Sequence, residues 1–238
     1  MRKEEPQIAG LFNQIAPRYD LLNRLLSFRM DVLWRKKVAD ALPAGEGLSV
    51  LDLATGTGDL ALTLVSRCAR IQQVLGLDVA QNMLDIGRKK VLQLGYSSKI
   101  NLQKASAMEI PCDNCSFDAV TMAFGIRNVE DPAQVLREIH RVLKPGGLAL
   151  VLEFSMPSLW IIKSVYLFYF RHILPRVGAL LSGDLKAYRY LNQSVEDFPS
   201  GEAFLDLLRR SGFVATRANR LTFGVATIYV GEKDLARP

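Results

Sequence analysis

The sequence is poor in cysteine and histidine, with three of the first and two of the second in 238 residues. Cys112 and Cys115 have the C-x-x-C spacing, but no second pair and no nearby histidine completes a zinc site. A redox pair would open a helix after a strand, whereas this pair lies in a polar loop. Neither His140 nor His172 anchors a metal triad. We expect no metal ion, and cysteines kept reduced in the cytosol.

Long apolar runs are also absent. The most apolar stretch, residues 159–170, is interrupted by Lys163 and followed by Arg171, so it falls well short of the ~20 apolar residues that span a bilayer. It predicts an amphipathic helix, which could be a lid, the wall of an apolar pocket, a membrane contact or ordinary core packing. The charged N-terminus lacks an apolar segment, so we expect no signal peptide and a cytoplasmic location.

Basic residues outnumber acidic ones, giving a formal net charge of +6. Basic clusters occur in residues 34–37, 171–176 and 209–220. Nucleic acid could use such patches, but aromatic and basic residues do not alternate as they do in a single-strand binder. An anionic membrane surface or a solvated basic face explains the surplus as well. We expect no nucleic-acid partner, while peripheral membrane contact and a homodimer stay open.

The most informative stretch is residues 50–60, V-L-D-L-A-T-G-T-G-D-L, with Asp78 following twenty residues after Gly58. Its apolar residues indicate a buried parallel strand. Gly56 and Gly58 permit a tight turn with bare backbone, at the positive end of a helix that starts near Asp59. Asp78 ends a second apolar run, where a carboxylate can accept both hydroxyls of an adenosine ribose. The pattern indicates an adenosine-bearing cofactor.

Two cofactors compete for this turn. The two glycines and Ala61 satisfy the dinucleotide fingerprint, so an NAD-type interpretation is open. Asp52 and Asp59, however, place carboxylates on both sides of the turn. They would repel a pyrophosphate but attract the aminium and sulfonium of S-adenosylmethionine. The K-P-G-G turn at residues 144–147, leading into a strand, is not required in dinucleotide domains. These features favour a methyltransferase over a dehydrogenase.

Strands and helices alternate from residue 48 to residue 153, which predicts a parallel sheet covered on both faces. The expected strands are Ser49–Leu53, Gln73–Asp78, Ile100–Lys104, Phe117–Ala123, Leu148–Glu153, Phe213–Asn219 and Phe223–Val230. The expected helices are Asp59–Ala69, Gln81–Leu94, Pro132–Leu143 and Glu202–Arg210. We expect one domain over residues 1–238, with a helical N-terminal cap (1–47), a cofactor-binding core (48–155), a substrate-side helical insertion (156–199) and a C-terminal helix and strands (200–238).

The chain closely resembles the ubiquinone/menaquinone biosynthesis C-methyltransferase family from about Ile8 to Gly231. The segments that carry this resemblance are residues 12–20, 50–60, 122–129, 141–147, 152–155, 172–178, 188–191 and 194–198. F-G-I-R-N-V and H-I-L-P-R are the most specific of their motifs. The resemblance implies an α/β class I methyltransferase fold. It predicts a mostly parallel, seven-stranded doubly wound sheet with a helical N-terminal extension and a helical insertion before the last strands.

With the residues at the turn, the resemblance implies bound S-adenosylmethionine. The expected cofactor-binding residues are Asp52, Gly56, Thr57, Gly58, Asp78, Ser106, Ala107 and Ala123. Ser106 and Ala107 match the pair that frames the adenine. The family often has serine at the position of Ala123, so one cofactor hydrogen bond is in doubt here.

The resemblance also implies the reaction, methylation of a ring carbon of a reduced prenylated quinone next to a hydroxyl. Arg127 suits stabilisation of the developing quinolate, and Asn128 could orient the hydroxyl or a water. Asp59 could accept a proton through water. The structural alternatives are a loop-closing salt bridge for Arg127 and a helix-terminal carboxylate for Asp59. The expected substrate-side residues are Tyr19, His172, Tyr188 and Arg189.

The expected substrate is a menaquinone precursor, demethylmenaquinol, and the ubiquinone precursor is a second possible acceptor. Two other readings stay open. One is a methyltransferase for another small molecule, such as a phenol or a sterol. The other is a non-catalytic, cofactor-binding scaffold of a quinone-biosynthesis complex.

Overall fold

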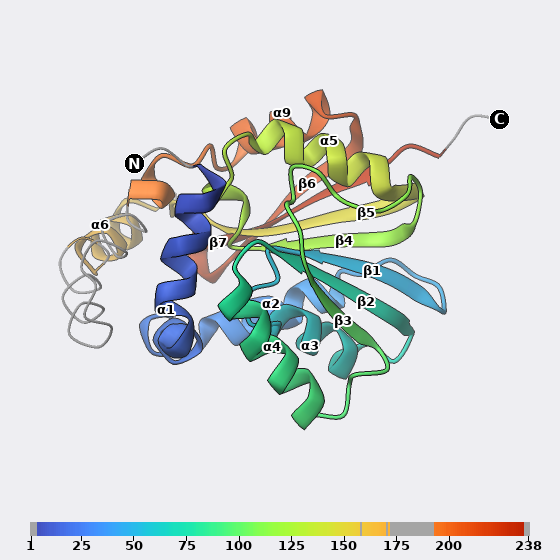
Figure 1. Cartoon of the computed structure of the whole chain (residues 1–238). Coiled ribbons are helices and arrows are strands. Elements are labelled where there is room, and N and C mark those ends of the chain that lie inside the picture. Colours follow the sequence, from blue (N-terminus) through green and yellow to red (C-terminus); the bar gives the residue numbers. More distant parts are fainter. Residues whose placement is uncertain (1–3, 158, 170, 172–192, 236–238) are drawn as a thin grey trace.

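The fold is built on a seven-stranded sheet with the order β3-β2-β1-β4-β5-β7-β6 (Figure 1). The computed structural model describes residues 4–157, 159–169, 171 and 193–235. The strands are β1 (Leu48–Leu53), β2 (Ile71–Asp78), β3 (Ile100–Lys104), β4 (Phe117–Ala123), β5 (Leu143–Phe154), β6 (Phe213–Leu221) and β7 (Ala226–Lys233). β7 runs antiparallel to β5 and β6, while β1 to β5 pair in parallel. The prediction of a mostly parallel seven-stranded sheet is confirmed.

Helices cover both faces of this sheet. One face carries α2 (Met30–Asp40), α3 (Asp59–Arg67) and α4 (Gln81–Gln93), and the other carries α5 (Pro132–Val142) and α9 (Glu202–Arg210). All six residues of β1 are buried, as expected of a central parallel strand between two helical layers. Asp131 caps α5 by accepting hydrogen bonds from the backbone N–H groups of Ala133 and Gln134. The predicted N-cap before Pro132 is confirmed.

Two predicted boundaries are wrong. The K-P-G-G segment does not precede β5 but lies inside it, because the strand begins at Leu143. Phe117 of β4 pairs with Leu143 of β5, and Ala119 pairs with Leu148. Between these two pairs β5 therefore contains more residues than β4. The turn is therefore an irregularity within a paired strand. The last strand begins at Ala226 instead of Phe223, because the short helix η3 (Thr222–Gly224) occupies that turn.

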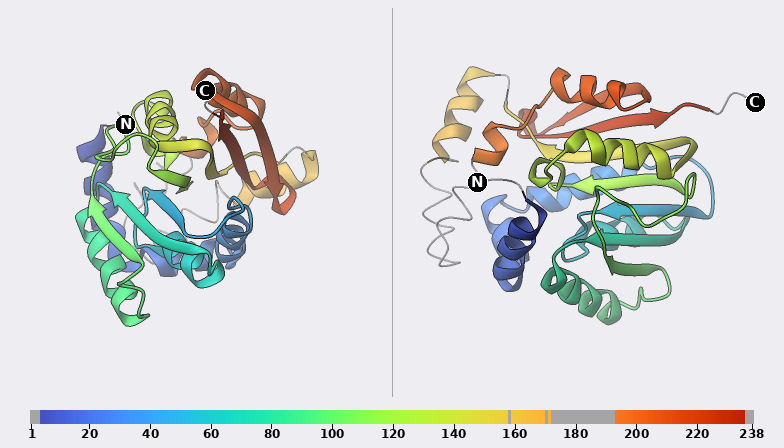
Figure 2. Two further views of the ribbon diagram at one scale, coloured as in Figure 1. Left: turned by 90° about the vertical axis from the view of Figure 1, so that its right-hand side faces the viewer. Right: turned by 45° about the horizontal axis from the view of Figure 1, so that its top comes forward.

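Helices α1 (Glu5–Leu26) and α6 (Trp160–Phe168) lie at the same end of the sheet (Figure 2). The hydroxyl of Tyr169, just after α6, donates to the carbonyl oxygen of Leu26 at 2.8 Å. The two elements thus form one wall although they are far apart in the sequence. Within the described ranges, no helix combines the length and apolarity needed to cross a bilayer.

Candidate active site

A cavity of about 770 Å³ lies at the carboxyl ends of β2 and β4, beneath α1. The lining residues come from α1, the glycine turn and the segments that follow β2, β3 and β4: Glu5, Ile8, Phe12, Tyr19, Ala54, Gly56, Leu77, Asp78, Val79, Met83, Ala105, Ser106, Ala107, Met108, Met122, Ala123, Phe124, Gly125, Asn128, Val129 and Glu130. Five predicted cofactor-binding residues, namely Gly56, Asp78, Ser106, Ala107 and Ala123, are among them. We call this space the first cavity.

Asp78 is the fixed anionic group of the first cavity. Its carboxylate accepts the N–H of Gly56 and the N–H of Ala80, each at 2.8 Å. Burial raises the pKa of Asp78, against the opposing effect of these backbone hydrogen bonds. The glycine turn and the end of β2 therefore hold each other through this side chain. Each oxygen retains a lone pair that can accept a ribose hydroxyl.

The rest of the first cavity also fits S-adenosylmethionine. Met83 and Met108 provide apolar walls, and Ala107 and Ala123 leave space where larger side chains would fill it. At Gly125 an added Cβ would lie 2.5 Å from the Cβ of Ala54, so the side chain of Ala54 packs directly against the backbone of Gly125. A carboxylate fixed at the end of β2, with apolar walls beside it, matches an adenosine group. Asp78 would hold the ribose, and the apolar walls would enclose the adenine.

Three other predicted cofactor-binding residues do not line this cavity. Asp52 lies beneath the turn, 1 % exposed, and accepts the hydroxyl hydrogens of Thr55 at 2.6 Å and Thr121 at 2.7 Å. Burial raises the pKa of Asp52 to about 6. Thr57 is turned away and donates to Asp20 on α1 at 2.6 Å. Gly58 supplies the left-handed backbone before α3, with φ of 77°. In this structure these residues build the turn, and cofactor contact by their side chains stays a prediction.

A second, larger cavity of about 1400 Å³ adjoins the first. The two cavities share Phe12, Tyr19, Phe124 and Asn128. Apolar residues dominate the second cavity. They come from α1, α2, the turn between these helices, the α6 region, the end of β5 and the turn before β7: Leu11, Ile15, Leu22, Leu26, Phe28, Met30, Trp34, Phe154, Tyr166, Tyr169 and Val225. Tyr19, a predicted substrate-side residue, thus lies where both cavities meet. The aromatic segment at 159–170 contributes part of the wall, as one of its predicted roles required.

Arg127 borders the second cavity but is held in an ion pair. Its Nη1 lies 2.7 Å from Oε1 of Glu153 and also donates to the carbonyl oxygen of Phe124 at 2.7 Å. The guanidinium carbon lies 5.3 Å from the ring centre of Phe154. Arg127 Nε and Glu153 Oε2 are both buried, and neither has a hydrogen-bond partner among the described residues. The salt-bridge alternative therefore describes the observed geometry, and direct contact with the substrate stays a prediction.

Glu153 was missed at the sequence level. It is fully buried, and burial raises the pKa of its carboxyl group against the charge of Arg127. The available signal was a single acidic residue at the end of the apolar run of β5. Asn128, by contrast, lines both cavities as its predicted role requires, and its amide donates to the carbonyl oxygen of Phe124 at 3.2 Å.

Asp59 does not fit its predicted role as proton acceptor. It lines neither cavity and forms ion pairs with Lys90, Arg35 and Arg24. Burial alone would raise the pKa of Asp59, but the three cations outweigh it and lower the pKa. Because its carboxylate lies outside both cavities, it cannot accept a proton directly from a substrate bound in them. Its position in the first turn of α3 matches the alternative, an acidic residue at a helix N-terminus.

The remaining predicted substrate-side residues, His172, Tyr188 and Arg189, lie outside the described residues. His140 packs edge-on against the ring of Phe213 at 5.2 Å, as a structural residue would. Cys112 is half-buried and Cys115 is exposed, both in the loop before β4.

Comparisons with known proteins agree with this geometry. The model of the ubiE/COQ5 methyltransferase family matches residues 1–233. The ubiquinone/menaquinone biosynthesis C-methyltransferase UbiE of Geobacter sulfurreducens is 47 % identical over 229 residues, which cover 96 % of this chain and 89 % of the relative. The demethylmenaquinone methyltransferase of Thermus thermophilus is 47 % identical over 223 residues, covering 94 % of this chain and 100 % of the relative.

Solved structures show the same fold at low sequence identity. An S-adenosylmethionine-dependent methyltransferase from Thermotoga maritima, described as a possible histamine N-methyltransferase, superposes with a TM-score of 0.68 at 21 % identity. The match covers 95 % of this chain and 100 % of that structure. The class I methyltransferase fold is thereby confirmed. From the family match and the relatives together, the chain belongs to the ubiE/COQ5 methyltransferase family.

Proposed function

We propose that this protein transfers a methyl group from S-adenosylmethionine to a ring carbon of a reduced prenylated quinone precursor. The favoured substrate is demethylmenaquinol, which becomes menaquinol, and the ubiquinone precursor is the second candidate. Relatives with 45–47 % identity bear the names of both activities, so identity alone does not choose between the two quinols.

The observation that supports this proposal is the pairing of the two cavities. The first has a carboxylate for a ribose, while the second is larger and mainly apolar. The substrate combines a polar ring with a long apolar tail, and the second cavity matches that combination. Because the cavities meet at Tyr19, Phe124 and Asn128, a quinol ring in the second cavity would lie beside a methyl donor in the first.

The residues of the chain would perform two tasks. When bound, S-adenosylmethionine supplies an electrophilic methyl group. Walls from α1 exclude water and hold the two reactants in line, and such positioning can contribute ~7–11 kcal/mol of the barrier. The positive charge of Arg127 at the wall of the second cavity stabilises negative charge on a substrate oxygen. Asn128 orients that oxygen from the boundary of the two cavities.

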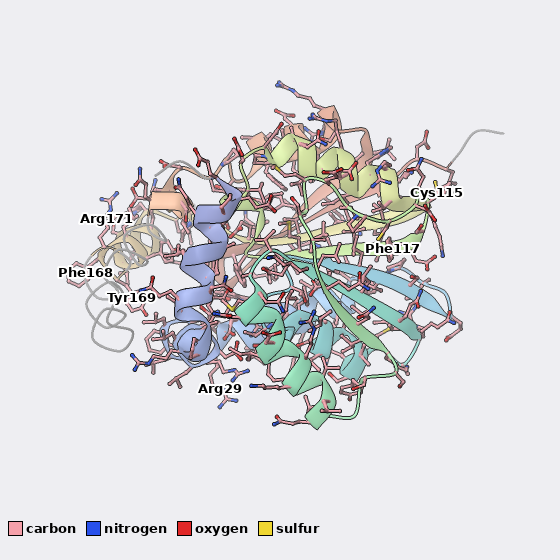
Figure 3. All side chains as sticks on the ribbon, viewed as in Figure 1. Arg29, Cys115, Phe117, Phe168, Tyr169 and Arg171 are labelled. Carbon is pink, nitrogen blue, oxygen red and sulfur yellow. The ribbon has the colours of Figure 1, made fainter. Side chains whose placement is uncertain are left out.

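Peripheral membrane contact at the inner face of the cytoplasmic membrane is part of the proposal. Trp160, Val165 and Phe168 on α6 are 75 %, 65 % and 61 % exposed, and Phe28 in the turn after α1 is 76 % exposed. The rings of Phe28 and Tyr169 lie 5.9 Å apart, and both residues line the second cavity. Figure 3 shows Phe168 and Arg171 at this end of the molecule. The prenyl tail would thus leave the cavity at an apolar surface.

The deciding assay follows methyl transfer from labelled S-adenosylmethionine to reduced demethylmenaquinone, with the demethylated ubiquinone precursor in parallel. We expect labelled product from the first quinol. Asp78→Asn should weaken cofactor binding, whereas Asp85→Asn, exposed on α4, should not. Cofactor binding without transfer to either quinol would favour the scaffold or another acceptor, such as a phenol or a sterol.

Membrane contact is tested by flotation with vesicles of phosphatidylethanolamine and phosphatidylglycerol. Trp160→Ser with Phe168→Ser should reduce the floating fraction. Leu92→Ser is the matched control, because Leu92 is 71 % exposed on α4. Equal flotation of all three proteins would contradict the proposed surface.

A further inference from the structure

Asp31 is a buried carboxylate at the wall of the second cavity. It lies in the first turn of α2 and is 3 % exposed. Within the part of the chain that the structure describes, no other carboxylate lines this cavity. The reaction proposed above requires a hydroxyl to lose its proton, and Asp59, the acceptor expected from the sequence, lines neither cavity.

The contacts of Asp31 orient its carboxylate. Its Oδ1 accepts the hydroxyl hydrogen of Ser27 at 2.7 Å, and its Oδ2 is paired with Arg35. Arg35 in turn lies 3.2 Å from Asp59, which also pairs with Lys90 and Arg24. Asp31 is therefore the inner end of a charged chain that reaches the N-terminus of α3. Ser27 and Arg35 line the cavity beside it.

The position of Asp31 relates it to the reacting end of the cavity. Trp34, one turn further along α2, has its ring 6.0 Å from the ring of Phe124, which lines both cavities. The other charged groups at the wall are Arg35, on the same helix, and Arg127, in the turn after β4. The phenols of this cavity are Tyr19, which also lines the first cavity, Tyr166 and Tyr169. Two cations and one carboxylate thus face a space where a quinol oxygen would lose a proton.

We propose that Asp31, directly or through the Ser27 hydroxyl, accepts the proton of the substrate hydroxyl next to the methylated carbon. This inference rests on the proposed function and adds its general base. The O–H bond breaks, the proton passes to the Asp31 carboxylate, and the released electron pair is delocalised onto the ring carbon. That carbon forms the new bond to the methyl group, and the pair of the carbon–sulfur bond remains on sulfur. Water then takes the proton from the same ring carbon, the ring becomes aromatic again, and the substrate oxygen regains the proton held by Asp31.

The first test compares Asp31→Asn with Asp40→Asn, a control on the same helix whose carboxylate is exposed and pairs with Arg67. General-base catalysis typically contributes about 10²–10⁴-fold, so Asp31→Asn should lower kcat at neutral pH by about that factor. A phenolic hydroxyl ionises near pH ~10. The deficit of Asp31→Asn should therefore shrink as pH rises, whereas Asp40→Asn should follow the wild-type profile.

A second readout needs no cofactor. 1-Naphthol becomes strongly acidic when excited and emits as the naphtholate if a base beside it takes the proton. When 1-naphthol is bound to the wild type or to Asp40→Asn, it should emit as the naphtholate. When it is bound to Asp31→Asn, it should emit as the neutral naphthol. Because Ser27 and Asp31 also brace the turn between α1 and α2, Asp31→Glu is included, and it should restore both the emission and part of kcat.

The outcomes separate the two proposals. If the wild type methylates neither quinol, the proposed function fails. If the wild type is active, and Asp31→Asn loses activity equally at every pH while keeping naphtholate emission, Asp31 is only a bracing residue and the inference is overturned. An Asp31→Asn variant with unchanged kcat overturns it as well.

Discussion

The two sides of the first cavity are built in different ways. On the sheet side, the carboxylate of Asp78 is fixed by two backbone N–H groups, and the glycine turn connects directly to buried strands. On the other side, α1 buries only three of its residues, Ile8, Ala16 and Leu22. The first side is thus part of the core, whereas the second is a helix laid over it. The difference teaches that the sheet side is held by core burial, whereas the helix over it is held by fewer buried residues.

Polar side chains attach the cover, helix α1, in addition to the apolar packing of Ala16 with Ala80 and Met83. Asp20 accepts the Thr57 hydroxyl at 2.6 Å and the Lys90 ammonium at 2.8 Å, which ties α1 to the glycine turn and to α4. The side-chain oxygen of Asn13 accepts the backbone N–H of Asn82 at 2.8 Å. Such contacts exchange readily for water, unlike the apolar packing of the sheet. Four predictions test this division, beginning with the largest expected effect.

Arg127→Ala should destabilise the sheet side most. Removing one member of a buried ion pair leaves an uncompensated charge, here on Glu153, at a typical cost of about 3–5 kcal/mol. Chemical denaturation measures this loss. The matched variant Arg127→Met with Glu153→Leu removes both charges and should recover most of the stability. If that double variant also regains methyl transfer, Arg127 serves only the fold and not the substrate.

Asp52, on the sheet side of the first cavity, and Asp59, which pairs with the cover, should change the free energy of unfolding with pH in opposite directions. The folded-state pKa of Asp52, about 6, exceeds its ordinary value of 3.8, so the folded protein binds the extra proton between those values. Its contribution to the free energy of unfolding therefore falls by on the order of 3 kcal/mol as pH rises from about 4 to 6. The pKa of Asp59 is lowered, so its contribution is present above about pH 4 and is lost below it.

Denaturation curves of the wild type and Asp52→Asn between pH 4 and 7 isolate the first contribution. The difference in free energy of unfolding between the two proteins should change across this range. A constant difference would show that Asp52 titrates at its ordinary pKa.

Steric tolerance should differ between the sides. A Cβ at Gly87 on α4 would lie 2.7 Å from Leu102 Cδ1 and 3.1 Å from the backbone of Thr57, whereas nothing lies within 4 Å of one at Gly10 on α1. Overpacking costs about 1–3 kcal/mol, so Gly87→Val should lower the melting temperature. Gly10→Val should change the stability by no more than about 0.5 kcal/mol. Equal effects would contradict the division.

Lys90→Met should loosen the cover with the least effect on the core. Its ammonium donates to Asp20, Thr57 and Asp59, and its side chain is 21 % exposed. After allowance for partial solvent screening, we expect a loss of about 1.4 kcal/mol, or about tenfold faster cofactor release. Stopped-flow dissociation measures this rate. Lys37→Met, from an exposed pair with Asp40, is the control and should release cofactor at the wild-type rate.

Local sequence patterns predicted the sheet side well. Gly56 of the glycine turn, Asp78, Ser106 and Ala107 all line the first cavity, because a strand–turn–helix segment and the ends of neighbouring parallel strands converge by topology. The same sequence motifs did not show that Thr57 contacts Asp20 of α1, or that Asp59 contacts Lys90 of α4, rather than lining the cavity. Their partners are distant in the sequence, and no local rule connects Asp20 or Lys90 to the turn.

The sequence by itself determined the class of fold, the glycine turn after the first strand and the family, since these follow from periodicity and from motifs read within a few residues. Only the tertiary structure decided what each charged group does. In the folded protein Arg127 pairs with Glu153, and Asp59 forms ion pairs outside both cavities. Asp31 lies at the wall of the second cavity. Charge acts through space, and the separations that set a carboxylate's role are fixed when α1 and α2 fold against the sheet.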